Sequence, residues 1–135
     1  MIKRADEYYM GLALKLALKA KGKTSPNPLV GSLVVKAGRI IGRGFHAQAG
    51  LAHAEIIALD EAGNKAKGAT LYVTLEPCAH TGRTAPCVNR IIESGIKEVV
   101  VGMIDPNPLN NGRGLMLLKQ NKIKVRAGFL EDQLK

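Results

Sequence analysis

Three short stretches constrain this chain more than any other feature, because together they carry one imidazole, two thiols and a carboxylate. They are His53-Ala54-Glu55, Thr74-Leu75-Glu76-Pro77-Cys78 and Pro86-Cys87. Imidazole and thiolate are ligands that zinc prefers, and three protein ligands leave the fourth position of a tetrahedral metal open for water. Zinc lowers the pKa of such a water towards neutrality. We therefore predict a catalytic zinc site with His53, Cys78 and Cys87 as ligands and Glu55 as the general acid/base.

The spacing of His53 and Glu55 sets a geometric condition on this site. Residues two apart on a helix point in nearly opposite directions. The two side chains can still share a site if they stand in the first turn of a helix over residues 53–62, with the metal beyond the helix end. That end carries the positive pole of the helix dipole, which favours thiolates and a developing anion.

Length and composition indicate one soluble domain over residues 1–135. The 135 residues are 46% hydrophobic and 23% charged, as in ordinary globular proteins. No apolar run approaches the roughly 20 residues of a membrane span, and the N-terminus does not read as a signal peptide. A cytoplasmic location is expected. Two cysteines in such a chain indicate metal binding or catalysis before a disulfide.

The net charge of +9 indicates solubility, an anionic substrate or a nucleic-acid partner. The basic residues are scattered along the chain, and it has only two Phe, three Tyr and no Trp. Single-strand binders usually combine a basic groove with aromatic stacking platforms, so the composition disfavours nucleic acid. A phosphorylated small molecule fits the charge equally well.

The hydrophobic pattern predicts alternating helices and strands. Residues 6–22 read as a largely buried helix with Asp6 as its N-cap, and residues 31–36 and 39–45 as a strand hairpin. The later elements are a strand at 70–75, a helix at 85–94, a strand at 97–102, a helix at 115–120, and a half-buried strand whose outer face carries Lys122, Lys124 and Arg126. We expect a three-layer α/β/α sandwich with a mixed five-stranded sheet.

The motifs resemble a known family. His53-x-Glu55 and Pro77-Cys78 match the signature of zinc-dependent nucleobase deaminases, but the second cysteine follows nine residues after the first instead of three. This longer spacing resembles the deaminase domain of the bifunctional riboflavin-biosynthesis protein, a diaminohydroxyphosphoribosylaminopyrimidine deaminase with a cytidine deaminase-like fold. The resemblance extends to Pro26-Asn27-Pro28-Leu29-Val30-Gly31, Gly42-Arg43-Gly44-Phe45-His46 and Asp105-Pro106-Asn107-Pro108.

The resemblance implies a reaction and a substrate site. The reaction is hydrolytic deamination of 2,5-diamino-6-ribosylamino-4(3H)-pyrimidinone 5′-phosphate to 5-amino-6-ribosylaminouracil 5′-phosphate. It also implies that base, ribose or phosphate is held by Asn27, His46, His80, Arg83, Thr84, Asp105 and Asn107. Residue chemistry supports Arg83, whose guanidinium suits bidentate phosphate contact. Asn27 could equally be a turn residue, and Thr84 could cap the next helix.

Several alternatives stay open. The chain could deaminate another nucleoside, nucleobase or tRNA base, be a structural zinc module that binds a partner, or be a silent homologue. A structural site usually has four protein ligands and would leave Glu55 without a role. His80 could replace a cysteine as a ligand, although one imidazole and two thiolates are already sufficient. The family's reductase domain is absent from these residues, so they are either an excised domain or a stand-alone deaminase with a separate reductase partner. The resemblance also implies a homo-oligomer.

Overall fold

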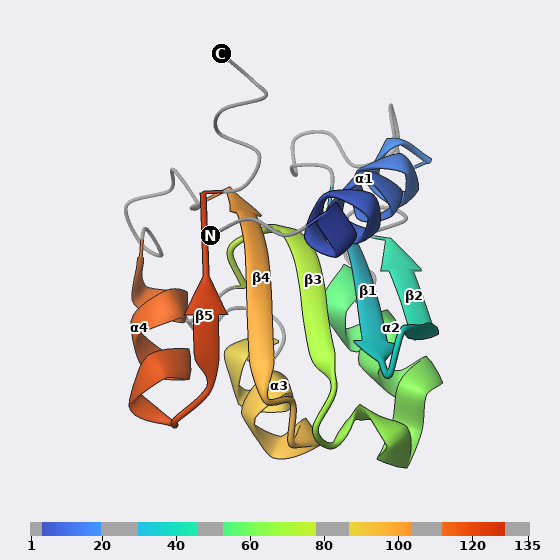
Figure 1. Cartoon of the computed structure of the whole chain (residues 1–135). Helices are drawn as coiled ribbons and strands as arrows, with labels where there is room; N and C mark the ends of the chain where they lie inside the picture. The colour runs from blue at the N-terminus through green and yellow to red at the C-terminus, as the bar shows by residue number, and fades with distance from the viewer. Residues whose placement is uncertain (1–3, 20–29, 46–52, 78–86, 104–111, 129–135) are drawn as a thin grey trace.

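The computed structural model describes residues 4–19, 30–45, 53–77, 87–103 and 112–128. Within them the elements, in chain order, are α1 (Arg4–Leu18), β1 (Gly31–Lys36), β2 (Arg39–Phe45), α2 (Ala54–Ala62), the 3₁₀ turn η1 (Gly63–Ala66), β3 (Thr70–Leu75), α3 (Cys87–Ser94), β4 (Glu98–Met103), α4 (Arg113–Gln120) and β5 (Lys124–Arg126). The strands form one sheet in the order β2-β1-β3-β4-β5 (Figure 1). No helix in the described ranges has both the length and the hydropathy to cross a bilayer.

The sheet is mixed, as predicted. Strand β1 is antiparallel to both β2 and β3, whereas β3, β4 and β5 run parallel. The β1–β2 turn has Ala37 and Gly38 at φ values of 51° and 76°. Positive φ at both central residues matches the twist of a two-residue hairpin, so this turn joins antiparallel strands directly. The parallel strands need longer crossovers, in which α3 and α4 stand.

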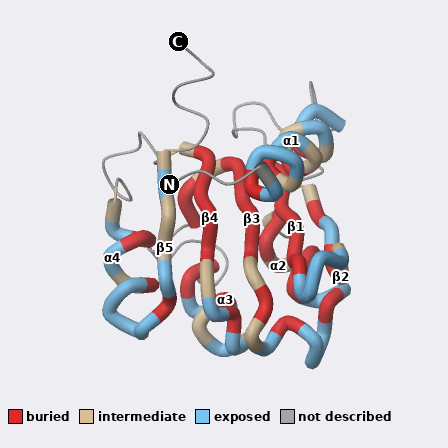
Figure 2. The backbone as a smooth tube through the Cα atoms, viewed as in Figure 1, coloured by how far each residue is buried: buried red, intermediate tan, exposed pale blue. Residues whose placement is uncertain are grey.

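Alternate side chains of the central strands enter two separate cores. In β3, Leu71 and Val73 pack with residues of α2, α3 and α4, whereas Tyr72 packs with α1. Strand β4 repeats the pattern, because Val99 and Val101 join the first core and Val100 joins the second. The central strands are accordingly buried along most of their length (Figure 2). The predicted three-layer α/β/α arrangement is confirmed, with three helices on one face and α1 on the other.

The ends of four strands meet at one edge of the sheet, which we call the carboxyl edge (upper edge in Figure 1). Gly31 pairs with Phe45, and Leu75 pairs with Met103. The backbone N–H of Gly31 donates to Oγ1 of Thr74 at 3.1 Å, which joins the two pairs. The described chain therefore enters or leaves residues 20–29, 46–52, 78–86 and 104–111 at this edge.

Helix α1 differs from the prediction in its start, end and burial. It begins at Arg4, so Asp6 is inside the helix and the N-cap assignment was wrong. The helix ends at Leu18, four residues before the predicted end. Its buried residues form one narrow stripe, whereas Tyr8 and Leu18 are 63% and 52% exposed, so it is not a largely buried helix. The stripe consists of Asp6, Met10, Ala13 and Ala17.

The C-terminal elements are also shifted. Helix α4 begins two residues before the predicted start, and β5 covers only Lys124–Arg126. Lys122 stands before the strand in a turn with φ of 65°. Arg126 is hydrogen-bonded to Asp6 and Glu98, so it does not belong to a solvated outer face. The prediction of a basic outer face was therefore wrong for these two residues.

Candidate metal and catalytic site

The start of α2 presents His53 and Glu55 from a single turn. His53 is the N-cap residue, with φ of −70° and ψ of 157°, and its carbonyl accepts the N–H of Ile57 at 3.2 Å. Its ring does not cap the helix. Glu55 is the second helical residue, and its carboxylate is buried, with 4% of the residue exposed. The geometric condition on the His-x-Glu spacing is met, because both residues stand at the helix start.

The start of α3 brings a thiol to the same place. Cys87 is the first residue of α3 and is 1% exposed, and its Sγ lies 2.9 Å from Nδ1 of His53. The two residues are 34 positions apart in the chain. Two helix N-termini therefore converge on a nitrogen–sulfur pair, and both dipoles favour a thiolate there. A ring nitrogen and a sulfur that face each other in a partly buried position suit two ligands of one zinc ion.

Two glycines of β2 determine how closely α2 approaches the sheet. A Cβ atom on Gly44 would lie 2.2 Å from the carbonyl oxygen of Ala54, and one on Gly42 would lie 2.1 Å from that of Ala58. Any larger residue would push the helix away, and with it His53 and Glu55. In the sequence, Gly42-x-Gly44 stands out only as part of the Gly42-Arg43-Gly44-Phe45-His46 motif. Its alternate spacing in a strand, directly before the metal helix, was the signal for a close helix–strand contact.

The other predicted site residues lie outside the described residues. They are Asn27, His46, Cys78, His80, Arg83, Thr84, Asp105 and Asn107. Across the ranges that the structure describes, no three His, Cys, Asp or Glu side chains are grouped so that they could hold a metal ion. The third predicted ligand, Cys78, directly follows the described Pro77. The described donors, one imidazole and one thiol, thus fit part of a zinc site.

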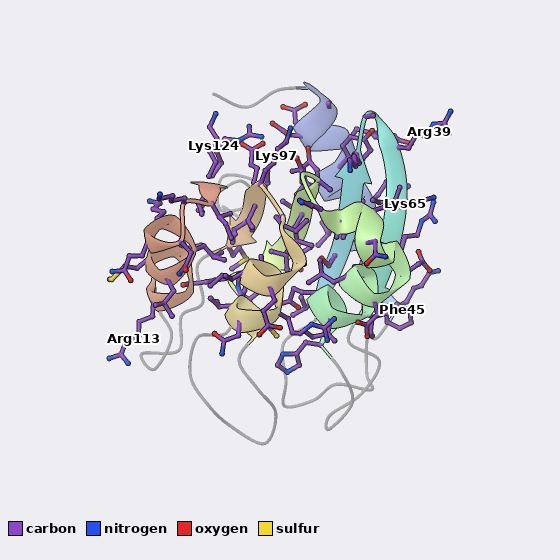
Figure 3. The ribbon with its side chains drawn as sticks, turned by 90° about the horizontal axis from the view of Figure 1, so that it is seen from below. Arg39, Phe45, Lys65, Lys97, Arg113 and Lys124 are labelled. Carbon is purple, nitrogen blue, oxygen red and sulfur yellow. The ribbon has the colours of Figure 1, made fainter. Side chains whose placement is uncertain are left out.

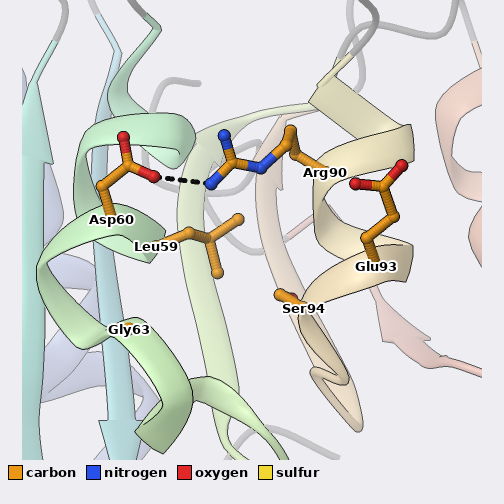
Figure 4. Close-up of a pocket in the computed structure, with 6 residues that line it drawn as sticks. All are labelled: Leu59, Asp60, Gly63, Arg90, Glu93 and Ser94. Atoms are coloured by element: carbon orange, nitrogen blue, oxygen red, sulfur yellow. Dashed lines mark hydrogen bonds and ion pairs between the residues drawn. The ribbon is translucent and has the colours of Figure 1, made fainter.

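A shallow hollow lies elsewhere, between α2 and α3 (Figure 4). It is lined by Leu59, Asp60, Gly63, Arg90, Glu93 and Ser94. The carboxylate of Asp60 and the guanidinium of Arg90 form an ion pair of 2.5 Å across it, with half-exposed side chains. Neither His53, Glu55 nor Cys87, the site residues within the described ranges, lines this hollow, so it does not coincide with their position.

The exposed basic side chains are spread around the molecule. Figure 3 labels five described basic side chains: Arg39 and Lys65 lie on one side of the molecule, Arg113 lies on another, and Lys97 and Lys124 lie next to each other. These side chains do not gather on one surface, which agrees with the scattered basic residues seen in the sequence.

A buried charged cluster ties α1 to the sheet on the face opposite to α2. Asp6, which is 3% exposed, accepts hydrogen bonds of 2.5 Å from the hydroxyl of Tyr72 and from Arg126. Arg126 also donates to Glu98 at 3.1 Å. Burial, and then the hydrogen bond to Asp6, raises the pKa of Tyr72 above its ordinary range, and the hydrogen bond to Asp6 raises the pKa of Arg126.

Residues 3–103 match the family model described as the cytidine and deoxycytidylate deaminase zinc-binding region. The chain therefore belongs to the cytidine and deoxycytidylate deaminase family, and the class of protein is a hydrolytic deaminase. The family resemblance and the fold expected from it are confirmed.

Individual relatives within this family are similar to the chain over nearly all of its length. The chain is 58% identical over 133 residues to riboflavin biosynthesis protein RibD of Aquifex aeolicus, which covers 98% of this chain and 37% of that protein. It is 47% identical over 128 residues to the diaminohydroxyphosphoribosylamino-pyrimidine deaminase of Buchnera aphidicola from Schizaphis graminum, covering 95% of this chain and 87% of the relative. The structure of Acinetobacter baumannii RibD aligns with a TM-score of 0.93 at 50% identity, over 96% of this chain and 36% of that one. The chain thus spans little more than a third of these RibD proteins.

Proposed function

We propose that this chain is the pyrimidine deaminase of riboflavin biosynthesis. It would hydrolyse 2,5-diamino-6-ribosylamino-4(3H)-pyrimidinone 5′-phosphate to 5-amino-6-ribosylaminouracil 5′-phosphate, releasing ammonia. The observation that carries the proposal is the contact of 2.9 Å between His53 Nδ1 and Cys87 Sγ, beside the buried Glu55 on the first turn of α2. The Buchnera relative, whose name states this reaction, supports the substrate.

His53, Cys78 and Cys87 would hold a zinc ion, whose chemistry is to make water a nucleophile at neutral pH. Glu55 takes one proton from the attacking water and delivers it to the ring nitrogen, and then takes the proton of the added hydroxyl and delivers it to the departing amine. Its burial keeps bulk water from exchanging these protons. In this cycle water adds to the ring carbon that carries the amine, and the bond between that carbon and the amine nitrogen breaks.

The substrate would be held by residues of the segments 20–29, 46–52, 78–86 and 104–111, which are joined to strand ends at the carboxyl edge of the sheet. A base contact is proposed for Asn27, and a place in the lining of the substrate pocket for His46. Ribose or phosphate contacts are proposed for His80, Arg83, Thr84, Asp105 and Asn107. The described neighbours support this, because Gly31, Phe45, Leu75 and Met103 share that edge. A net charge of +9 suits a phosphorylated ligand.

We further propose that residues 1–135 act as one cytoplasmic deaminase domain, that copies assemble into homo-oligomers, and that a reductase, attached or separate, uses the product. A Thermotoga maritima protein structure supports the reductase connection, because its name joins a diaminohydroxyphosphoribosylaminopyrimidine deaminase to a 5-amino-6-(5-phosphoribosylamino)uracil reductase, and this chain covers 38% of it.

The experiment that tests the function is product formation by purified, zinc-loaded protein. The diaminopyrimidinone ribosyl phosphate and cytidine are supplied in parallel reactions. Turnover of the first alone is the expected result. Turnover of cytidine alone would favour the second candidate, a deaminase of another nucleoside, which the family description makes the nearest alternative. Bound zinc without turnover of either would contradict both and favour a structural module.

A further inference from the structure

Glu76 is a buried carboxylate for which the proposed chemistry has no use. It directly follows β3, and 3% of the residue is exposed. Its Oε1 accepts the N–H of Gly112 at 2.9 Å, while Oε2 accepts the N–H of Gly114 at 2.9 Å and of Leu115 at 3.3 Å. These donors are at the start of α4. The carboxylate therefore caps a helix whose N-cap residue, Gly112, lies 36 residues later in the chain.

The capping is needed because α4 has no cap of its own. Its N-cap residue is Gly112, which has φ of 83° and no side chain to accept the first N–H groups. A helix start leaves such donors unsatisfied, and its dipole favours a negative charge. Glu76 supplies both the acceptors and the charge.

The backbone of Glu76 makes a second connection. Its N–H donates to the carbonyl oxygen of Met103 at 2.8 Å. Met103 ends β4, and Gly112 precedes α4. One residue thus binds both described neighbours of residues 104–111, among which the proposed ligands Asp105 and Asn107 stand.

Gly114, in the first turn of α4, allows this helix to approach Glu76 and Pro77 closely. A Cβ atom on Gly114 would lie 2.2 Å from the carbonyl oxygen of Pro77 and 3.2 Å from Oε2 of Glu76. Backbone oxygen cannot yield as a flexible side chain would. The stretch Glu76–Pro77 therefore lies directly against the start of α4, and the next residue in the chain is the proposed ligand Cys78.

We infer that Glu76 is a positioning residue of the site: it holds the chain that leads into Cys78 against the end of β4 and the start of α4. The inference rests on the proposed function, because that function makes Cys78 a zinc ligand. If the role of the cap were purely structural, its loss would lower the stability of the protein and nothing else. If Glu76 positions the site, loss of the cap must also change zinc retention and substrate affinity.

The first test uses Glu76→Gln and Gly114→Ala in the full chain. Gln has the size of Glu but no charge and one acceptor fewer, whereas Gly114→Ala leaves Glu76 intact and displaces Pro77. The readouts are the rate at which zinc passes to a colorimetric chelator, and KM separately from kcat. We expect zinc release to accelerate about tenfold, the size of effect seen when metal ligands lose their supporting partners, and KM to rise. Tyr72→Phe is the control, since it removes a buried hydrogen bond of β3 on the opposite face and should leave both readouts within about twofold.

The second test needs no variant. Coupling between two sites is reciprocal, so removal of zinc should weaken the cap as loss of the cap weakens zinc binding. Hydrogen exchange at the amides of Gly112, Gly114 and Leu115 should accelerate in the zinc-free wild type, while the amide of Tyr72 stays protected.

The outcomes separate this inference from the proposed function. Variants that lose stability but keep wild-type zinc release and KM, or cap amides that are indifferent to zinc, would overturn the positioning role while zinc binding and turnover of the wild type stand. A wild type that retains no zinc would instead contradict the proposed function, and the inference with it. If Glu76→Gln does not fold, Gly114→Ala and the exchange measurement decide.

Discussion

The Nδ1 atom of His53 lies 2.9 Å from the Sγ atom of Cys87, and each residue stands at the N-terminal end of its own helix. This relationship brings a half-buried imidazole and a buried thiol from distant parts of the chain to one place. It also orients two helix dipoles towards the same point.

Loss of either member of the pair should abolish tight zinc binding. In His53→Ala and Cys87→Ser we expect the zinc affinity to fall by more than about 100-fold, because even loss of an outer partner of a ligand costs about 10- to 100-fold. Zinc per chain, measured after equilibration in a zinc buffer, checks this. Asn89→Ala, an exposed position on α3, is the control. Unchanged zinc content in both ligand variants would remove them from the metal site.

Glu55 should be needed for turnover but not for the metal. In Glu55→Ala we expect bound zinc to be retained while kcat falls by about 10²- to 10⁴-fold, the contribution of a general acid/base. Glu55→Gln separates the loss of the proton carrier from the loss of buried volume, and should be similarly slow. Glu93→Gln, an exposed carboxylate on α3, should react at the wild-type rate. Near-normal turnover of Glu55→Ala would refute the mechanism.

The close contact between β2 and α2 should make Gly44 intolerant of a methyl group. The added Cβ of Gly44→Ala would lie 2.2 Å from the carbonyl oxygen of Ala54. We expect the free energy of unfolding to fall by about 1–3 kcal/mol, the usual cost of overpacking, and turnover to fall with it. The matched control is Gly11→Ala in α1, where a Cβ meets nothing within 4 Å. Alanine there should stabilise the helix by up to about 1 kcal/mol. Urea unfolding of both variants checks the contrast.

The two arginine pairs should differ in their contribution to stability. Arg126→Met leaves the carboxylate of Asp6 buried with one partner fewer, whereas Arg90→Met breaks an exposed pair. Breaking a buried pair costs about 3–5 kcal/mol, but the Arg126 side chain is 26% exposed. Solvent screening reduces the expected loss to about 2 kcal/mol. Arg90→Met should change stability by less than about 1 kcal/mol. Equal losses in denaturant unfolding would show that burial does not distinguish the pairs.

Tyr72 should make stability fall at alkaline pH. Burial and the hydrogen bond to Asp6 raise its pKa above the ordinary 10.0. Above about pH 10 the phenol ionises in the unfolded chain but stays protonated in the folded one. The unfolded state then binds fewer protons, and the free energy of unfolding decreases as the pH rises.

The comparison with Tyr72→Phe isolates this effect from the titration of lysines. At pH 8 the variant should be less stable by about 1 kcal/mol, the net value of one hydrogen bond. By pH 11 the difference should close, because one pKa unit corresponds to about 1.4 kcal/mol. Urea unfolding of both proteins between pH 8 and 11 measures it. Parallel stability curves would contradict the raised pKa.

Much of the fold could be predicted because its local signals are strong. The hairpin at residues 31–36 and 39–45 matched β1 and β2, and the strand at 70–75 matched β3, because short runs of β-forming residues such as Leu33-Val34-Val35 and Leu71-Tyr72-Val73 are bounded by turn residues. The start of α2 at Ala54 also agreed with the prediction for His53 and Glu55. The zinc ligands and substrate residues stay predictions as far as their roles are concerned, and most of them lie outside the described residues.

The errors arose where a distant partner overrides the local preference. Asp6 has the chemistry of an N-cap, but Arg126, which is 120 residues away, and the hydroxyl of Tyr72 bind its carboxylate inside the protein. The same contact removes Arg126 from the outer face of β5. No pattern within one element contains these partners, so local reasoning could not find them.

The sequence alone determined the order of the elements, the mixed sheet and the types of metal-binding side chains, because hydrophobic periodicity and ligand chemistry are properties of short stretches. The tertiary structure alone decided which glycines allow a helix to pack closely on the sheet, that the carboxylate of Asp6 is buried in a charged cluster, and that Glu76 caps α4. These are properties of distances between segments far apart in the chain. Buried charges and backbone donors must find partners wherever packing brings them, and only the folded chain shows which partners those are.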